Sequence, residues 1–194
     1  MLDLIKHFDI ASWVTTIGYV GLLLIVLIET GFFFGFFLPG DSLMFTAGLL
    51  ASKGIFSIWI LTPAIIVMAI IGYTIGYWFG DRLGGWLLKR KESFLFKKRY
   101  IETANEFYDK HGGKALVIGR LVPIVRTFVP IVAGMATMPY RRYFTYNVLG
   151  SLMWGGGITL LGYSLGAMVP NAGHYVLPAV IVIVILSVLP GVIH

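Results

Sequence analysis

The stretch between Lys53 and Asp81 contains no charged residue, and this feature constrains the fold more than any other. A helix needs about 20 apolar residues to cross the hydrocarbon core of a bilayer, and this stretch is longer. The whole chain agrees, because 58% of its 194 residues are hydrophobic, 12% are charged and the mean hydropathy is +0.87. A soluble domain has about twice that charged fraction. The sequence therefore predicts an all-α integral membrane protein.

Apolar segments of the same kind recur along the chain, which we interpret as a single membrane domain covering residues 1–194. Four transmembrane helices are predicted, over residues 13–28, 55–80, 143–169 and 175–192. Residues 1–12 have neither the basic start nor the small-residue cleavage site of a signal peptide. Their spaced apolar side chains predict a short amphipathic helix at the membrane interface.

Two further apolar segments, residues 29–52 and 115–138, differ because proline and ionisable residues interrupt them. Irregular backbone at membrane depth is tolerated only where it is buried in protein or lines a cavity. We therefore predict that each segment forms a re-entrant helical hairpin. The residues expected to shape these hairpins are Pro39, Gly40, Pro123 and Pro130.

The basic residues are concentrated in one polar segment, although the net charge of +6 might at first suggest nucleic-acid binding. Residues 81–114 contain nine of the fifteen basic residues, and this excess predicts a cytoplasmic loop. With this loop inside, both termini are expected to be cytoplasmic. The two hairpins then enter from opposite sides and can meet near the middle of the bilayer. We predict no nucleic-acid partner.

A weak internal repeat supports the same arrangement. At a constant offset of 86 residues, Ala47-Gly48 matches Ala133-Gly134, and Gly76-Tyr77-x-x-Gly80 matches Gly162-Tyr163-x-x-Gly166. In the predicted topology the two halves have opposite orientations, which is the inverted-repeat plan of many secondary transporters.

Four ionisable residues lie within the predicted hairpins, namely Glu29, Asp41, Arg120 and Arg126. Each costs about 3 kcal/mol at the centre of a membrane helix, so the set needs pairing, water or a ligand. Two acids and two arginines form a neutral set if the hairpins meet. Guanidinium groups beside the amides of broken helices favour an anion such as phosphate. The alternative is that these charges only pair to stabilise the fold, or that the arginines extend to an interface.

Other kinds of chemistry lack a matching pattern. The chain has no cysteine, and no histidine pair has the spacing of metal ligands. No Ser-His-Asp arrangement, phosphate-binding P-loop or dinucleotide-binding glycine motif occurs in a fitting context. The sequence therefore predicts no catalytic residues, no metal site and no cofactor, and we expect the protein not to be an enzyme.

Two stretches resemble the DedA family of membrane proteins, which is related to the eukaryotic VTT-domain lipid scramblases. The stretch "ETGFFFGFFLPGDSLMFTAG" is similar to the family's first hairpin, and "GRLVPIVRTFVPIVAGMATMPYRRYFTYNVLG" is similar to its second. The segment "FYDKHGGKALVIGR" fits the usual sequence before the second hairpin, and the resemblance extends from about residue 10 to the end. One departure is Gly72-Tyr73, where the family often has Gly-Asp.

The resemblance implies that Glu29 and Asp41 are proton-responsive acids and that Arg120 and Arg126 bind a lipid headgroup phosphate. It further implies a flippase, linked to the proton-motive force, that recycles undecaprenyl phosphate or a related lipid phosphate across the bacterial cytoplasmic (inner) membrane. The expected partners are this membrane lipid and protons, and a homo-oligomer remains open.

Three alternatives to the coupled flippase remain. An uncoupled phospholipid scramblase differs from it only in its independence of a pH gradient. A membrane lipid phosphatase could use paired arginines, but the sequence offers no histidine nucleophile at membrane depth. A proton/cation exchanger supporting membrane-potential homeostasis could use the acids, although two arginines in the same cavity would repel cations.

Overall fold

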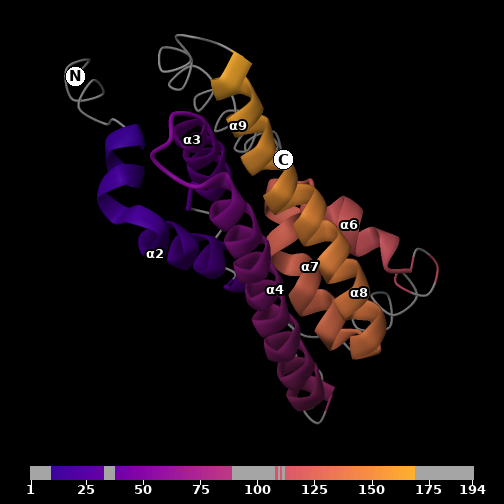
Figure 1. Cartoon of the computed structure of the whole chain (residues 1–194). Coiled ribbons are helices and arrows are strands. Elements are labelled where there is room, and N and C mark those ends of the chain that lie inside the picture. The colour runs from indigo at the N-terminus through magenta and orange to yellow at the C-terminus, as the bar shows by residue number, and fades with distance from the viewer. Residues whose placement is uncertain (1–9, 33–37, 89–107, 109, 111, 169–194) are drawn as a thin grey trace, which may run out of the picture. The chain divides into compact units, whose positions relative to one another are not determined.

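The computed structural model describes residues 10–32, 38–88, 108, 110 and 112–168, and every regular element among them is helical (Figure 1). The chain divides into two compact units. The first comprises residues 1–26, 38–68 and 155–194, and the second comprises residues 27–37 and 69–154. The all-helical prediction is therefore confirmed for the described part of the chain.

In chain order, the described helices are α2 (Ile10–Gly31), α3 (Gly40–Ser52), α4 (Ile58–Leu88), α6 (Lys114–Arg120), α7 (Pro123–Met135), α8 (Tyr140–Ser151), the π-helical turn η2 (Leu152–Gly156) and α9 (Gly157–Met168).

Two of the predicted transmembrane helices are confirmed as long apolar helices. They cover Ile58–Gly85 and Tyr140–Met168, both long and apolar enough to cross a bilayer. The predicted helix over residues 13–28 is not continuous, because Gly18 in α2 has φ 64° and ψ −165°. Only glycine adopts such a conformation readily, and the apolar helix beyond it, Gly18–Gly31, is shorter. The predicted helix over residues 175–192 and the interfacial segment 1–9 lie outside the described residues.

The first predicted hairpin begins later than expected. Glu29 is still in the last turn of α2, so the chain leaves the helix only after Gly31. The next helix, α3, begins at Gly40 with Pro39 immediately before it. Residues 33–37 lie outside the described residues, and the return of this segment through the membrane stays a prediction.

The second predicted hairpin consists of α6 and α7, which contact each other. Leu121 and Val122 join them, and Val122 is extended, with φ −104° and ψ 114°. Pro123 is the first residue of α7, where its missing N–H costs nothing. The expectation that Pro130 also interrupts the helix is wrong, since α7 continues through it to Met135. That the segment enters and leaves the membrane on one side stays a prediction.

The predicted polar loop over residues 81–114 is shorter than expected at both ends. Helix α4 extends through its first part to Leu88, and α6 begins at Lys114. Residues 89–107 lie outside the described residues.

The repeated glycine motifs are places of close helix contact, each within its own unit. In the first unit α3 lies against α9, as Figure 1 shows, and a Cβ on Gly48 would overlap the Thr159 carbonyl. In the second unit a Cβ on Gly134 of α7 would overlap the Tyr77 carbonyl of α4. Each Ala-Gly pair therefore lies against the helix with the Gly-Tyr-x-x-Gly motif of the other sequence half. The opposite orientation of the two halves in a membrane stays a prediction.

The core of the second unit contains four buried tyrosines. Each hydroxyl donates a hydrogen bond to a main-chain carbonyl far away in the sequence: Tyr73 to Arg126, Tyr77 to Met138, Tyr108 to Val129 and Tyr143 to Tyr73. Such bonds link residues that are distant in the sequence and satisfy buried hydroxyl groups. This unit holds the candidate site.

Candidate functional site

Arg126 and Glu29 form a buried ion pair in the second unit. The guanidinium Nη2 of Arg126 donates to Oε1 of Glu29, and the two residues are 6% and 0% exposed. Arg126 is in the first turn of α7, and Glu29 is in the last turn of α2. The pairing of an acid from one predicted hairpin segment with an arginine from the other is confirmed for these two residues.

Close packing of α2 on α4 places Glu29. Gly31 and Gly72 meet so closely that a Cβ on Gly31 would lie 3.2 Å from the Gly72 Cα. A Cβ on Gly72 would overlap the side chain of Thr30. Since any larger residue at Gly72 would push the end of α2 away, this glycine sets the position of the carboxylate.

Arg120 is also buried, but neutral oxygens surround it. Its Nη1 donates to the Asn147 carbonyl at 3.0 Å and to Ser151 Oγ at 2.6 Å, while Nη2 donates to Asn147 Oδ1 at 3.1 Å. Gly150 on α8 provides the space, since a Cβ there would lie 3.2 Å from Nη1. Arg120 forms no ion pair with any residue that the structure describes. A positive charge thus remains in the protein interior.

Aromatic rings lie beside both arginines. The Arg120 guanidinium lies 3.5 Å above the centroid of the Tyr73 ring. Both arginines also face the buried ring of Trp154, with guanidinium carbons 5.9 Å (Arg120) and 4.9 Å (Arg126) from its centroid. Desolvated cation–π contacts of this kind each contribute about 2 kcal/mol. Arg120 and Arg126 therefore both lie beside the indole of Trp154.

Tyr73 also explains how α7 tolerates Pro130. A proline in a helix leaves the carbonyl four residues earlier without its N–H donor, and that residue is Arg126. The Tyr73 hydroxyl donates to this Arg126 carbonyl at 2.8 Å. The residue that departs from the family pattern therefore contacts Arg120 with its ring and Arg126 with its hydroxyl.

Asn147, Ser151 and Trp154 were missed by sequence reasoning. Asn147 donates from Nδ2 to the Ile70 carbonyl at 3.0 Å, which holds α8 against α4 while its oxygens accept from Arg120. A signal was available, because Tyr143, Asn147 and Ser151 recur every four residues and so share one face of α8.

Asp41 lies in the first turn of α3, in the first unit, and is partly buried. Of the predicted neutral set of two acids and two arginines, the structure shows only the Glu29–Arg126 ion pair, and the set as a whole stays a prediction. Within the described residues of the second unit the site holds one acid and two arginines, an excess of positive charge that suits an anion. No group of three or more potential metal ligands occurs among the described residues.

Among the described residues, two helices are long and apolar enough to cross a membrane, and the arginine site is buried. The sequence model of the VTT domain matches residues 24–164. Protein DedA of Escherichia coli strain K12 is 39% identical over 201 residues, covering 100% of this chain and 91% of DedA. The chain belongs to the DedA family.

Further relatives have names that refer to membranes. An uncharacterized membrane protein of Mycobacterium leprae is 41% identical over 171 residues, covering 88% of this chain and 76% of that protein. The inner membrane protein YghB of Escherichia coli is 33% identical over 163 residues, covering 81% of this chain and 71% of YghB. None of these names states an enzymatic activity. No solved structure matches the chain.

Proposed function

We propose that the chain transports a lipid phosphate across the bacterial cytoplasmic membrane, as a flippase driven by the proton-motive force. Undecaprenyl phosphate or a related lipid phosphate is the proposed substrate. The observation that supports this most directly is the buried Arg120, whose positive charge has no acidic partner among the described residues. A permanent positive charge buried in a membrane protein is costly unless an anion binds to it.

Arg120 is held in a geometry that favours phosphate. Three hydrogen bonds to Asn147 and Ser151 fix the guanidinium plane. Its Nε is buried and has no hydrogen-bond partner among the described residues, so a donor remains for a ligand oxygen. A guanidinium group can donate two parallel hydrogen bonds to two oxygens of one phosphate. This favours phosphate over an anion that accepts only one such hydrogen bond.

In this proposal the availability of Arg126 for phosphate depends on whether Glu29 is protonated. While Glu29 is ionised, the carboxylate holds Arg126 and competes with the substrate. A proton on Glu29 removes that competition, so that Arg126 can join Arg120 in binding phosphate around Trp154. Loss of the proton restores the ion pair and releases the lipid. Asp41 is the second acid proposed to respond to protons.

The wider architecture belongs to the same proposal. The Ala-Gly contacts with opposite halves of the sequence support an inverted repeat with two opposed re-entrant hairpins. The positive residues near residues 89–114 support a cytoplasmic location for that loop and for both termini. The names of the Escherichia coli relatives support the inner membrane.

The test uses purified protein in liposomes with a fluorescent prenyl phosphate lipid in one leaflet. We expect the lipid to reach the other leaflet faster with a pH gradient than without one, and Arg126→Ala to abolish the difference. Movement that is fast but indifferent to the gradient would instead establish an uncoupled scramblase. No movement by folded wild-type protein would overturn transport of this lipid, and a gradient-driven cation flux would then identify an exchanger.

The proton step has its own test in the same liposomes. Glu29→Gln mimics the protonated acid, so transport should lose its dependence on pH while Arg126 stays available. Asp41→Asn should weaken that dependence as well. If both variants keep wild-type transport and the wild-type pH profile, neither acid couples protons to the lipid.

A further inference from the structure

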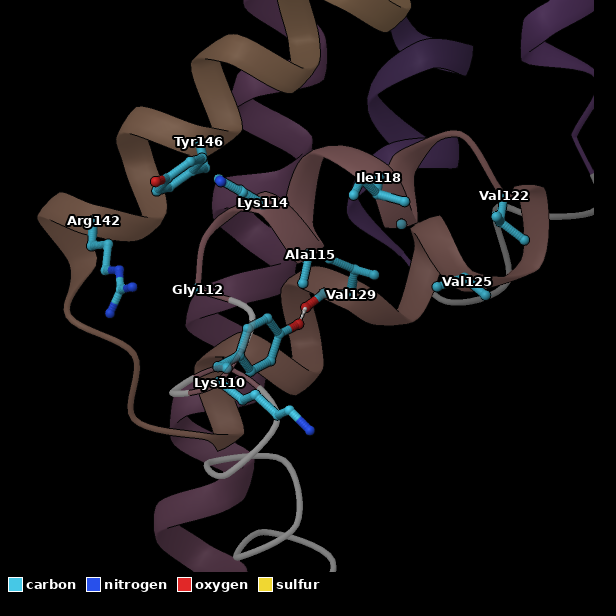
Figure 2. Close-up of a pocket in the computed structure, with 12 residues that line it drawn as sticks. Lys110, Gly112, Lys114, Ala115, Ile118, Val122, Val125, Val129, Arg142 and Tyr146 are labelled. Carbon is cyan, nitrogen blue, oxygen red and sulfur yellow. Dashed lines mark hydrogen bonds between the residues drawn. The ribbon is translucent and has the colours of Figure 1, made fainter.

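A pocket in the same unit lies outside the arginine site. It has a volume of about 720 Å³ and lies among α6, α7 and α8 (Figure 2). Neither Glu29 nor Arg120 nor Arg126 lines it. Its size is within the range of about 300 to 1,000 Å³ that is usual for small-ligand pockets.

One part of the pocket is cationic. Lys110, Lys114 and Arg142 line it, all three side chains are exposed, and no acidic residue lines it among the described residues. None of the three forms an ion pair or hydrogen bond with another described side chain. Asp109 and His111, on either side of Lys110, lie outside the described residues. Three cations around one pocket favour an anionic ligand.

The other part of the pocket is apolar and open. Ile118, Val122 and Val125 line it and are 63%, 40% and 44% exposed. Figure 2 shows Arg142 at one side of the pocket and Val122 and Val125 at the opposite side. The charged and apolar parts of the pocket are therefore separated. Such a lining suits an amphiphilic ligand better than a small inorganic ion.

Two glycines shape the cationic part. Gly112 has φ +62°, and a Cβ there would lie 2.7 Å from the Arg142 Nη2. A Cβ on Gly113 would overlap the ring of Tyr146, which also lines the pocket. Tyr108, which also lines the pocket, donates to the Val129 carbonyl at 3.1 Å, and burial raises the pKa of its hydroxyl.

We propose that this pocket binds an anionic phospholipid of the surrounding bilayer. The phosphate lies against Arg142, Lys114 and Lys110, and an acyl chain runs along Ile118, Val122 and Val125. Arginine and lysine near a membrane surface attract anionic headgroups. The exposed aliphatic side chains would contact the acyl chain of the lipid. This is a second lipid site, and it stands whether or not the protein moves lipid between leaflets.

The test is photolabelling of the full chain in phosphatidylcholine nanodiscs that contain a trace of phosphatidic acid with a diazirine on its acyl chain. We expect crosslinks to map to peptides containing Ile118 and Val125. A phosphatidylcholine probe with the same diazirine should label them much less. Arg142→Gln and Lys114→Gln should each weaken phosphatidic acid labelling roughly tenfold, since each removes one charged hydrogen-bond donor.

Arg141→Gln is the matched control, because Arg141 is the exposed neighbour of Arg142 and does not line the pocket. It should label as the wild type does. Equal labelling by the two probes, or equal labelling of the Arg141 and Arg142 variants, would overturn the proposal. Displacement by millimolar inorganic phosphate would also overturn it, since the apolar part would then contribute nothing. Glu29→Gln separates the two sites, because it should change the pH dependence of transport and leave this labelling intact.

Discussion

Arg120 and Arg126 lie on consecutive helices and face the same indole, yet their partners are of different kinds. Arg126 is neutralised by one carboxylate, that of Glu29, whereas Arg120 is held by the neutral oxygens of Asn147 and Ser151. A carboxylate can lose its charge to a proton, while an amide and a hydroxyl cannot. In the proposed mechanism, a single site therefore combines a permanent cation with one that protonation of Glu29 makes available.

The largest expected effect comes from breaking the ion pair on one side. Arg126→Ala leaves Glu29 charged and buried, which should lower the free energy of unfolding by about 3–5 kcal/mol. Adding Glu29→Gln should recover much of this loss without restoring transport. Thermal unfolding in detergent measures the first effect, and Arg141→Ala serves as the exposed-arginine control. An equally large loss in the double variant would show that packing, and not the charge, is what Arg126 supplies.

Lysine substitutions should separate the two arginines. Arg120→Lys cannot keep all three of its hydrogen bonds in one plane, and each lost bond to a charged group costs about 1.5–3 kcal/mol. Arg126→Lys keeps a charge for Glu29 and should lose less stability. Unfolding temperatures of the two variants, measured side by side, test this order. A larger loss of stability in Arg126→Lys than in Arg120→Lys would contradict the conclusion that hydrogen bonds fix the guanidinium plane of Arg120.

The smallest of these effects should come from Tyr73→Phe, which keeps the ring against Arg120 and removes only the hydroxyl. The Arg126 carbonyl then loses its donor, at a cost of about 1–3 kcal/mol. Pro130→Ala restores a main-chain N–H to that carbonyl, so the double variant should be less destabilised than the two single changes added together. Strict additivity would mean that Tyr73 does not compensate for Pro130.

The sequence predicted those parts of the site that depend on charged residues within apolar segments, because such residues are rare. Charges within apolar segments are few, so Glu29 and Arg126 could be expected to meet once both segments were recognised. The break between Arg120 and Arg126 followed from Pro123. Glycine motifs at a fixed offset likewise marked the places where helices approach closely.

The rest depended on how helices pack. The contact of the Tyr73 hydroxyl with a carbonyl 53 residues later requires a specific rotation of α4 against α7, which no local pattern encodes. Pro130 looked like a helix breaker because its compensating donor is distant in sequence. Gly18 breaks α2 although glycine is ordinary in membrane helices, so the residue type alone gave no warning.

The separation of Glu29 and Arg126 has a consequence for biosynthesis. The two residues are 97 positions apart, and at about 5–20 residues per second a ribosome needs roughly 5 to 20 s to supply Arg126 after Glu29. Throughout that interval the nascent chain offers the insertion machinery an acidic helix end with its eventual arginine not yet made. Until Arg126 is made, Glu29 must therefore be protonated, hydrated or beside the translocon.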